Sequence, residues 1–193
     1  MSGTGKEYRM ILSDKEIREM IDSGRLSITP FDEGQIQPAG VDFTLGNTFG
    51  KLIASGGEMI MPGGKPGYKM ITANRYLLDP GEFVLASTLE YFRFPDDLVA
   101  MIGGRSSYSR LGLFVQNTGW ISPGFHGQLT IELYNAGKAA VVVESGERLG
   151  QLLFAKTGTP AESPYNGRYQ GQTDVTGSMA YKDLHIRHSS QQE

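Results

Sequence analysis

Cysteine is absent from the 193-residue chain, and this absence removes several kinds of chemistry. A chain without thiols forms no disulfides, carries no thiol nucleophile and builds no zinc site from thiolates. Histidine is also scarce: only His126, His185 and His188 occur, and the last two lie in a polar stretch near the C-terminal end. The sequence therefore predicts no metal centre held by the protein's own side chains.

Long apolar runs and a strong charge of either sign are missing too. No run approaches the about 18 apolar residues of a membrane-spanning helix, and the polar residues 1–10 lack the apolar core of a signal peptide. We therefore expect a cytoplasmic protein with no membrane partner. The net charge of -3 predicts no broad attraction to nucleic acid. A small anionic ligand would need only a local cluster of donors.

One helix is indicated near the start of the chain. Ser13 is a good N-cap, and Glu16 three residues later completes a capping box. Gly24 is the expected C-terminal stop. The apolar residues of the predicted helix share one face, and they are Ile17, Met20 and Ile21.

After Gly24, short apolar or alternating runs are separated by turn residues, which is typical of an all-β sandwich or barrel. The predicted strands include residues 41–45, 83–88, 98–102, 129–134, 139–143 and 149–154. The predicted turns include residues 79–81, 95–97, 122–124, 135–137 and 144–146. The 26 glycines fit a fold that is rich in turns.

No repeat or linker divides the chain, so we expect a single domain over residues 1–193. The Gly-rich residues 55–67 are predicted to form a long exposed loop or hairpin. Residues 185–193 are predicted to be a flexible, solvated tail.

A Gly-Ser-Arg segment, residues 103–112, is the first candidate for binding chemistry. Its two leading glycines would let the backbone approach a ligand closely, and its hydroxyl and main-chain N–H groups can donate to phosphate oxygens. Arg105 and Arg110 can add charge-assisted hydrogen bonds. This mixture suits a polyphosphate, and the alternative is a plain surface turn.

The second candidate is Glu132, which lies in a run that predicts a strand with two different faces. The polar face would carry Gln128, Thr130, Glu132 and Tyr134, and the opposite face Leu129, Ile131 and Leu133. If the polar face is enclosed in a pocket, Glu132 is a candidate general base. If that face is solvated, Glu132 has no chemical role.

The third candidate is the segment of residues 165–172, which offers aromatic rings, a cation and amide groups. Such a segment can act as a mobile lid over a nucleotide. The alternative is a loop that packs on its neighbours.

These segments, in this order and spacing, resemble the family of dCTP deaminases and dUTPases over residues 10–183. The matching motifs are residues 10–14, 37–42, 78–85, 104–107, 110–113, 124–127, 130–133, 150–152 and 169–172, together with Asn135. The motifs at 78–85 and 104–113 are closer to the deaminase branch. The resemblance implies a distorted jelly-roll-like β-barrel, with a short N-terminal helix, that assembles as a homotrimer with sites at the subunit interfaces.

The resemblance also implies a deoxynucleoside triphosphate bound together with Mg²⁺. It assigns the phosphates and the positioning of the base to Arg105, Ser106, Ser107 and Arg110. It assigns the base and sugar pocket to Thr130, Ile131 and Glu132. It assigns the closing C-terminal segment to Tyr165, Arg168 and Gln172. Deaminases that resemble this chain use no zinc, which agrees with its lack of zinc ligands.

Glu132 is the residue that favours deamination. Water must add to C4 of cytosine and ammonia must leave, and one carboxylate can move both protons in turn. The deaminases have this carboxylate at the position of Glu132, where dUTPases have an apolar residue. Ser106 and Arg110 would help to orient the water and the base.

Two features depart from the family pattern. Ser122 stands where the family has an Asp that contacts the sugar and, in dUTPases, orients the attacking water. The run from Arg110 to Ser122 is one residue shorter than in the usual deaminase, and Trp120 places a large ring near the expected pocket. Ser122 therefore argues against a dUTPase and against an enzyme that forms dUMP directly.

The main hypothesis is a dCTP deaminase that releases dUTP and ammonia, and so supplies dUTP for dUMP and dTTP synthesis. Two alternatives stay open. One is a pyrophosphatase of the dUTPase type or a bifunctional deaminase that forms dUMP. The other is a noncatalytic nucleotide-binding regulator built on the same trimer.

Overall fold

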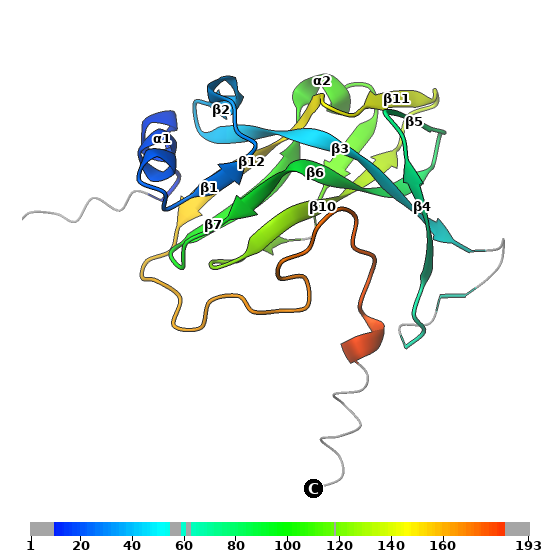
Figure 1. The fold of residues 1–193 in the computed structure, drawn as a ribbon. Coiled ribbons are helices and arrows are strands. Elements are labelled where there is room, and N and C mark those ends of the chain that lie inside the picture. Colours follow the sequence, from blue (N-terminus) through cyan, green and yellow to red (C-terminus); the bar gives the residue numbers. More distant parts are fainter. Residues whose placement is uncertain (1–9, 55–58, 61–62, 118, 184–193) are drawn as a thin grey trace, which may run out of the picture.

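The computed structural model describes residues 10–54, 59–60, 63–117 and 119–183, and within them the chain is mainly β (Figure 1). The helical elements are α1 (Asp14–Asp22), the 3-10 turn η1 (Glu33–Gln35) and α2 (Ser106–Ser109). The strands are β1 (Ser27–Thr29), β2 (Ile36–Gln37), β3 (Gly40–Ile53), β4 (Gly67–Thr72), β5 (Arg75–Leu78), β6 (Phe83–Arg93), β7 (Leu98–Gly104), β8 (Leu113–Gln116), β9 (Trp120–Ile121), β10 (His126–Asn135), β11 (Val141–Glu144) and β12 (Arg148–Lys156).

Ten of these strands form one curled antiparallel sheet, and β5 and β11 form a separate pair (Figure 1). The order of the main path is β8-β10-β6-β3-β12-β7-β9, with β1 beside β6 and with β2 and β4 beside β3. Each of the six runs predicted as strands lies in or overlaps an observed strand, and most observed strands are longer. The mainly β class is confirmed, while closure into a jelly-roll-like barrel and assembly into a trimer stay predictions.

The predicted N-terminal helix is confirmed in detail. The Ser13 side chain accepts a hydrogen bond from the Glu16 main chain, and Glu16 bonds back to Ser13, which completes the capping box. Ile17 and Met20 are buried. The helix ends at its cap, Ser23, and Gly24 follows with a φ of +71°, a left-handed conformation that glycine adopts without strain.

The core lies between the curled sheet and the elements that cover it. Four phenylalanines are fully buried there, and they are Phe43, Phe49, Phe92 and Phe154. Strand β10 contributes through alternation, since Ile131 and Leu133 are fully buried whereas their neighbours are not. The two faces predicted for this strand are therefore confirmed.

The Gly-rich stretch is only partly described. Its C-terminal end forms the start of β4, which pairs with β3 from Thr48 opposite Thr72 to Ile53 opposite Gly67. The predicted hairpin is thus confirmed at its base, and the predicted tail, residues 185–193, lies outside the described residues. None of the helices in the described part of the chain has the length and apolar character that crossing a bilayer requires.

Glu90 on β6 is a carboxylic acid inside the fold, with only 1% of its surface exposed. Its Oε1 accepts hydrogen bonds from Gln35 Nε2 at 2.7 Å and from the Thr44 main-chain nitrogen at 2.9 Å. Burial raises the pKa of Glu90 above its usual 4.5, although these hydrogen bonds oppose the shift. The folded state therefore favours the protonated form of Glu90.

This burial predicts a pH dependence of stability. A raised folded-state pKa contributes stability at pH values below about 4.5, and that contribution is lost as the pH rises through the folded-state pKa. As the pH rises from about 4.5 through the folded-state pKa, we expect the melting temperature of Glu90→Gln to fall less than that of the wild type, because glutamine does not ionise. Parallel melting curves at closely spaced pH values test this. Identical pH profiles for the two proteins would contradict it.

Candidate functional site

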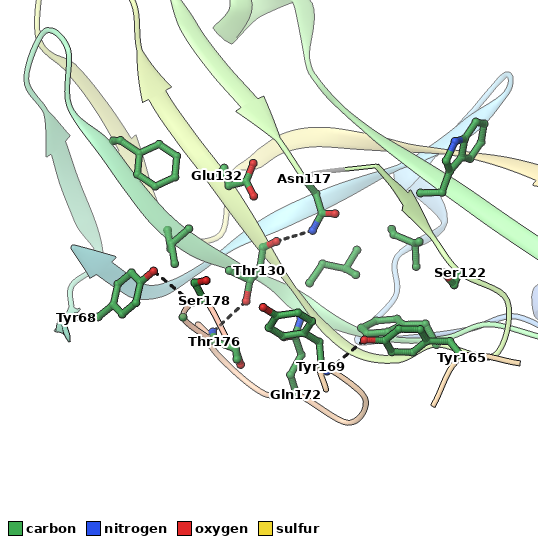
Figure 2. A pocket seen from close by; sticks show the side chains of 17 residues that line it. Tyr68, Asn117, Ser122, Thr130, Glu132, Tyr165, Tyr169, Gln172, Thr176 and Ser178 are labelled. Atoms are coloured by element: carbon green, nitrogen blue, oxygen red, sulfur yellow. Dashed lines mark hydrogen bonds between the residues drawn. The ribbon is translucent and has the colours of Figure 1, made fainter. Parts of the chain in front are cut away.

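A cavity of about 420 Å³ opens between β10, the β3–β4 hairpin and the C-terminal segment. Figure 2 shows Glu132 and Asn117 on one side of it and Tyr165, Tyr169 and Gln172 on the other. The residues that line it are Tyr68, Phe83, Leu85, Asn117, Trp120, Ile121, Ser122, Phe125, Leu129, Thr130, Glu132, Tyr165, Tyr169, Gln172, Thr176, Gly177 and Ser178. The polar face predicted for β10 therefore lines this partly open cavity at Thr130 and Glu132.

Glu132 reaches the cavity because of its place in the sheet. It lies on β10 between Leu85 of β6 and Gln116 of β8, its cross-strand partners. One step beyond Gln116, Asn117 donates a hydrogen bond of 2.7 Å from Nδ2 to the Thr130 carbonyl. A carboxylate, an amide and a hydroxyl thus lie together in a cavity with apolar walls such as Leu85 and Phe83.

The C-terminal segment forms the opposite wall. Gln172 donates from Nε2 to the Gln128 carbonyl at 2.8 Å, which holds its side chain against β10. Its Oε1 is buried and has no hydrogen-bond partner among the described residues. An acceptor buried without a donor costs free energy unless a ligand satisfies it. Gln172 therefore places a buried acceptor, without a partner in the described chain, at the wall of the cavity.

A second polar cluster surrounds Asp42, whose side chain is fully buried. Gln151 Nε2 donates to Asp42 Oδ1 at 2.9 Å. The guanidinium groups of Arg105 and Arg148 lie 3.5 and 3.6 Å from Asp42 Oδ2, and both side chains are partly exposed. Two cations side by side at the surface, oriented by one buried carboxylate, form a candidate site for an anion such as a phosphate.

The glycines before Arg105 differ in their surroundings. A Cβ at Gly103 would meet no atom within 4 Å, whereas one at Gly104 would lie 3.2 Å from Ser109 Oγ and 3.3 Å from Val115 Cβ. The space beside Gly103 is therefore open, and the predicted approach of a ligand there stays a prediction. Gly104 instead serves packing within the chain.

The structure separates the predicted site residues into two groups. The cavity collects Ser122, Thr130, Glu132, Tyr165 and Gln172. Elsewhere on the chain, outside the cavity wall, lie Arg105, Ser106, Ser107 and Arg110, which belong to α2 and its two ends.

Two further predicted residues also lie away from the cavity wall. The Ile131 side chain is in the core, so only its main chain is left for a ligand. Arg168 pairs with Asp183. In one chain, therefore, the predicted phosphate donors and the predicted base pocket do not meet.

Sequence reasoning missed several residues of the cavity wall, among them Asn117, Tyr169 and Tyr68. Asn117 lies in the run from Arg110 to Ser122, and Tyr169 lies in the segment 165–172. Their polar side chains in these segments were the only sequence signal that they line a site. Tyr68 follows the Gly-rich stretch, and no local pattern marks it. Trp120 was expected near the pocket, and it lines the cavity with 58% of its surface exposed.

The described residues contain no group of three or more His, Asp or Glu side chains arranged to hold a metal ion. The Mg²⁺ implied by the resemblance would therefore depend on the nucleotide for most of its ligands. Mg²⁺ commonly keeps several waters and binds through substrate phosphates. The donor set around Asp42, with two guanidinium groups beside the carboxylate, suits an anion rather than a cation.

Comparisons with known proteins place residues 11–157 within the family model described as dCTP deaminase-like. Over 180 residues the chain is 44% identical to "dCTP deaminase, dUMP-forming" from Persephonella marina, covering 90% of this chain and 99% of the relative. The protein of the same name from Aquifex aeolicus is 38% identical over 179 residues, covering 92% and 99%.

Among solved structures, the chain is similar to the 2'-deoxycytidine 5'-triphosphate deaminase of Agrobacterium tumefaciens. The TM-score is 0.61 and the sequence identity 25%, over 77% of this chain. The match covers 48% of that protein, so this chain spans about half of its length.

Proposed function

The chain belongs to the dCTP deaminase-like family, and from this premise we propose that it converts dCTP and two waters into dUMP, ammonia and pyrophosphate. The observation that carries the proposal is the place of Glu132, beside Thr130 and Asn117, in the wall of a cavity of about 420 Å³. The relatives named dUMP-forming support the second half of the reaction.

The main hypothesis from the sequence, that dUTP is the end product, is wrong by this comparison. Relatives up to 44% identical over 90% of the chain are named dUMP-forming, which matches the bifunctional alternative. The argument from Ser122 fails with it. Ser122 and Glu132 line the same cavity. The cavity therefore still contains a carboxylate, that of Glu132, although position 122 has none.

The first half of the reaction is hydrolysis of the amine on cytosine. Glu132 takes a proton from the water that adds to C4 and passes it to N3. The same carboxylate then moves the proton of the new C4 hydroxyl to the amine, which leaves as ammonia while the C4 carbonyl forms. The amine is the only donor on the cytosine ring of the nucleotide. The unpartnered Oε1 of Gln172 is a suitable acceptor for it. Binding there would distinguish cytosine from a base without an amine.

The second half is hydrolysis of the triphosphate. A second water attacks the α-phosphorus, the bond from that phosphorus to the bridging oxygen breaks, pyrophosphate leaves, and the proton of the water passes to solvent. Negative charge accumulates on the phosphate oxygens, which guanidinium groups and hydroxyls stabilise. Arg105, Ser106, Ser107 and Arg110 supply these donors. Mg²⁺ bound to the phosphates would add further charge neutralisation.

These donors lie outside the cavity of their own chain, so the reaction as proposed needs two chains. We infer a homotrimer in which the segment 105–110 of one copy completes the cavity of its neighbour. An exposed aromatic row supports such a contact. Tyr134 lies between Phe83 and Phe114 across three neighbouring strands, and all three are between 42% and 50% exposed. Apolar rows of this kind are commonly buried between subunits.

Sharing of sites predicts complementation between two inactive variants. Arg110→Ala and Glu132→Gln are each expected to be inactive as pure proteins, because each removes one half of every site. Co-expressed with different tags, the two chains should recover about one quarter of the wild-type activity, since a random mixture leaves both halves intact in about one site in four. Purified hetero-oligomers without any recovery would contradict a shared site.

Product analysis tests the proposed reaction itself. The purified protein is given dCTP and dUTP in separate reactions with Mg²⁺, and ammonia, pyrophosphate and nucleotides are measured. The proposal expects ammonia and pyrophosphate from dCTP. Nucleotide binding without any product from dCTP would reject it.

A further inference from the structure

The C-terminal strap, residues 172–179, is fastened to the sheet by a regular series of hydrogen bonds. The Gln128 main-chain nitrogen donates to the Gln172 carbonyl at 2.9 Å, and the Asp174 nitrogen donates to Gln128 Oε1 at 2.7 Å. Further along, the Thr176 nitrogen donates to Thr130 Oγ1 at 3.0 Å. Residues 172, 174 and 176 of the strap are thus each hydrogen-bonded to a residue of β10.

The last of these bonds ends on Tyr68, at the start of β4. The Ser178 nitrogen donates to the Tyr68 hydroxyl at 3.2 Å, and Figure 2 shows this pair at the end of the cavity away from Ser122. In Figure 1 the orange and red end of the chain runs past β10 toward β4. Tyr68 therefore joins two segments that are more than a hundred positions apart in the sequence.

Gly177 lies directly on the Tyr68 ring. A Cβ at position 177 would lie 2.5 Å from Cε2 and 2.7 Å from Cδ2 of that ring, which no side chain tolerates without displacement. Two residues earlier in the strap, Val175 packs on β3: a Cβ at Gly50 would lie 2.8 Å from Val175 Cγ1. The strap therefore contacts both strands of the hairpin, β3 at Gly50 and β4 at Tyr68. The contact with the Tyr68 ring requires glycine at position 177.

We propose that Tyr68 is a positioning residue that docks the strap and thereby holds Gln172 at the cavity. Its ring supports Gly177 and its hydroxyl accepts from Ser178, so it fixes the far end of the segment that carries Gln172 at its near end. The Met179 nitrogen also donates to the Tyr169 hydroxyl at 3.1 Å, which ties the docked strap to the aromatic wall of the cavity. The effect on turnover rests on the proposed function, whereas the docking itself does not.

Docking is measured first in the protein without nucleotide, by hydrogen exchange of the peptide that covers the strap. Tyr68→Phe keeps the ring and removes the acceptor, so exchange at the Ser178 amide should rise by about threefold to tenfold, the effect of one neutral hydrogen bond. Gly177→Ala should loosen the whole strap by a larger factor. Gly67→Ala, on the same strand and with nearest contacts of 3.6 Å, is the matched control and should exchange as the wild type does.

A double variant tests whether Gly177 acts through Tyr68. In a Tyr68→Ala background the ring is gone, so adding Gly177→Ala should cause no further loosening. Equal and additive effects of Gly177→Ala in both backgrounds would overturn the proposal. Unchanged exchange in Tyr68→Phe and Tyr68→Ala would overturn it too.

Turnover of dCTP then tests the positioning role. Tyr68→Phe should lower kcat/KM by up to about tenfold and Tyr68→Ala by more, mainly through KM if the strap closes over bound nucleotide. Loosened straps with wild-type kinetics would overturn the positioning role. A wild type that shows the predicted exchange but never turns over dCTP would refute the proposed function and leave the docking in place.

Discussion

Glu132→Gln is expected to reduce the release of ammonia from dCTP by about 10² to 10⁴, the usual contribution of a positioned general acid–base group. Glutamine has nearly the same shape, so the cavity and its neighbours Leu85 and Gln116 should keep their positions. The glutamine side chain, however, cannot accept a proton from water or return one to the amine. The measurement is the initial rate of ammonia formation at saturating dCTP, with dCTP binding followed separately by calorimetry.

A control for this variant is Glu144→Gln. Glu144 lies on β11 and pairs with Arg75 at the surface, away from the cavity lining. Its replacement should leave the rate within about twofold of wild type, because exposed ion pairs contribute little to stability. If Glu132→Gln keeps more than a tenth of the wild-type rate while it binds dCTP normally, the proposed role of Glu132 is wrong.

Gly150→Ala is expected to destabilise the fold by about 3 kcal/mol, the upper part of the range for overpacked cores. A Cβ at this position would lie 2.3 Å from Phe43 Cζ and 2.8 Å from the Gly103 carbonyl oxygen. Phe43 is fully buried and the second neighbour is main chain, so neither can easily move. Gly150 pairs with Gly104 across β12 and β7, so the disturbance would reach the strand that leads to Arg105.

The matched control is Gly103→Ala on the facing strand, where an added Cβ meets no atom within 4 Å. This variant should fold with nearly wild-type stability. Urea unfolding of both variants measures the difference. Equal unfolding free energies for the two variants would contradict the packing described around Gly150.

Elements defined by local patterns were predictable from the sequence. The capping box of Ser13 and Glu16 was confirmed because both partners lie within one helical turn. The turns at Gly81 and Gly146 were recognisable for a similar reason, and both glycines have positive φ values. The alternation that pointed Glu132 away from the core was confirmed because one face of β10 packs on the core.

Features that depend on distant segments were not predictable. Tyr68 meets Gly177 only because the hairpin and the C-terminal strap converge on the cavity, and neither residue has a local pattern. The pairing of Lys51 and Tyr76 with Glu82, which places two donors at 2.8 Å from one carboxylate oxygen, joins three separate strands or turns in the same way. No local pattern predicts that Arg105 and Arg110 lie apart from Glu132 within one chain, and only the interface sites implied by the resemblance anticipate it.

The sequence prediction about the product rested on Ser122, which cannot act as the carboxylate that orients the attacking water in dUTPases. The relatives named dUMP-forming overturn the conclusion drawn from it. A serine at 122 keeps a hydroxyl on the cavity wall that can contact the sugar or a water.

The central claim is that one protein carries dCTP through to dUMP, and the ratio of pyrophosphate to ammonia in early time points tests it most directly. With dCTP as the only nucleotide, the account predicts equal amounts of ammonia and pyrophosphate from the first turnovers onward, with dUMP as the nucleotide product. Ammonia accompanied by a matching amount of dUTP, without pyrophosphate, would contradict it.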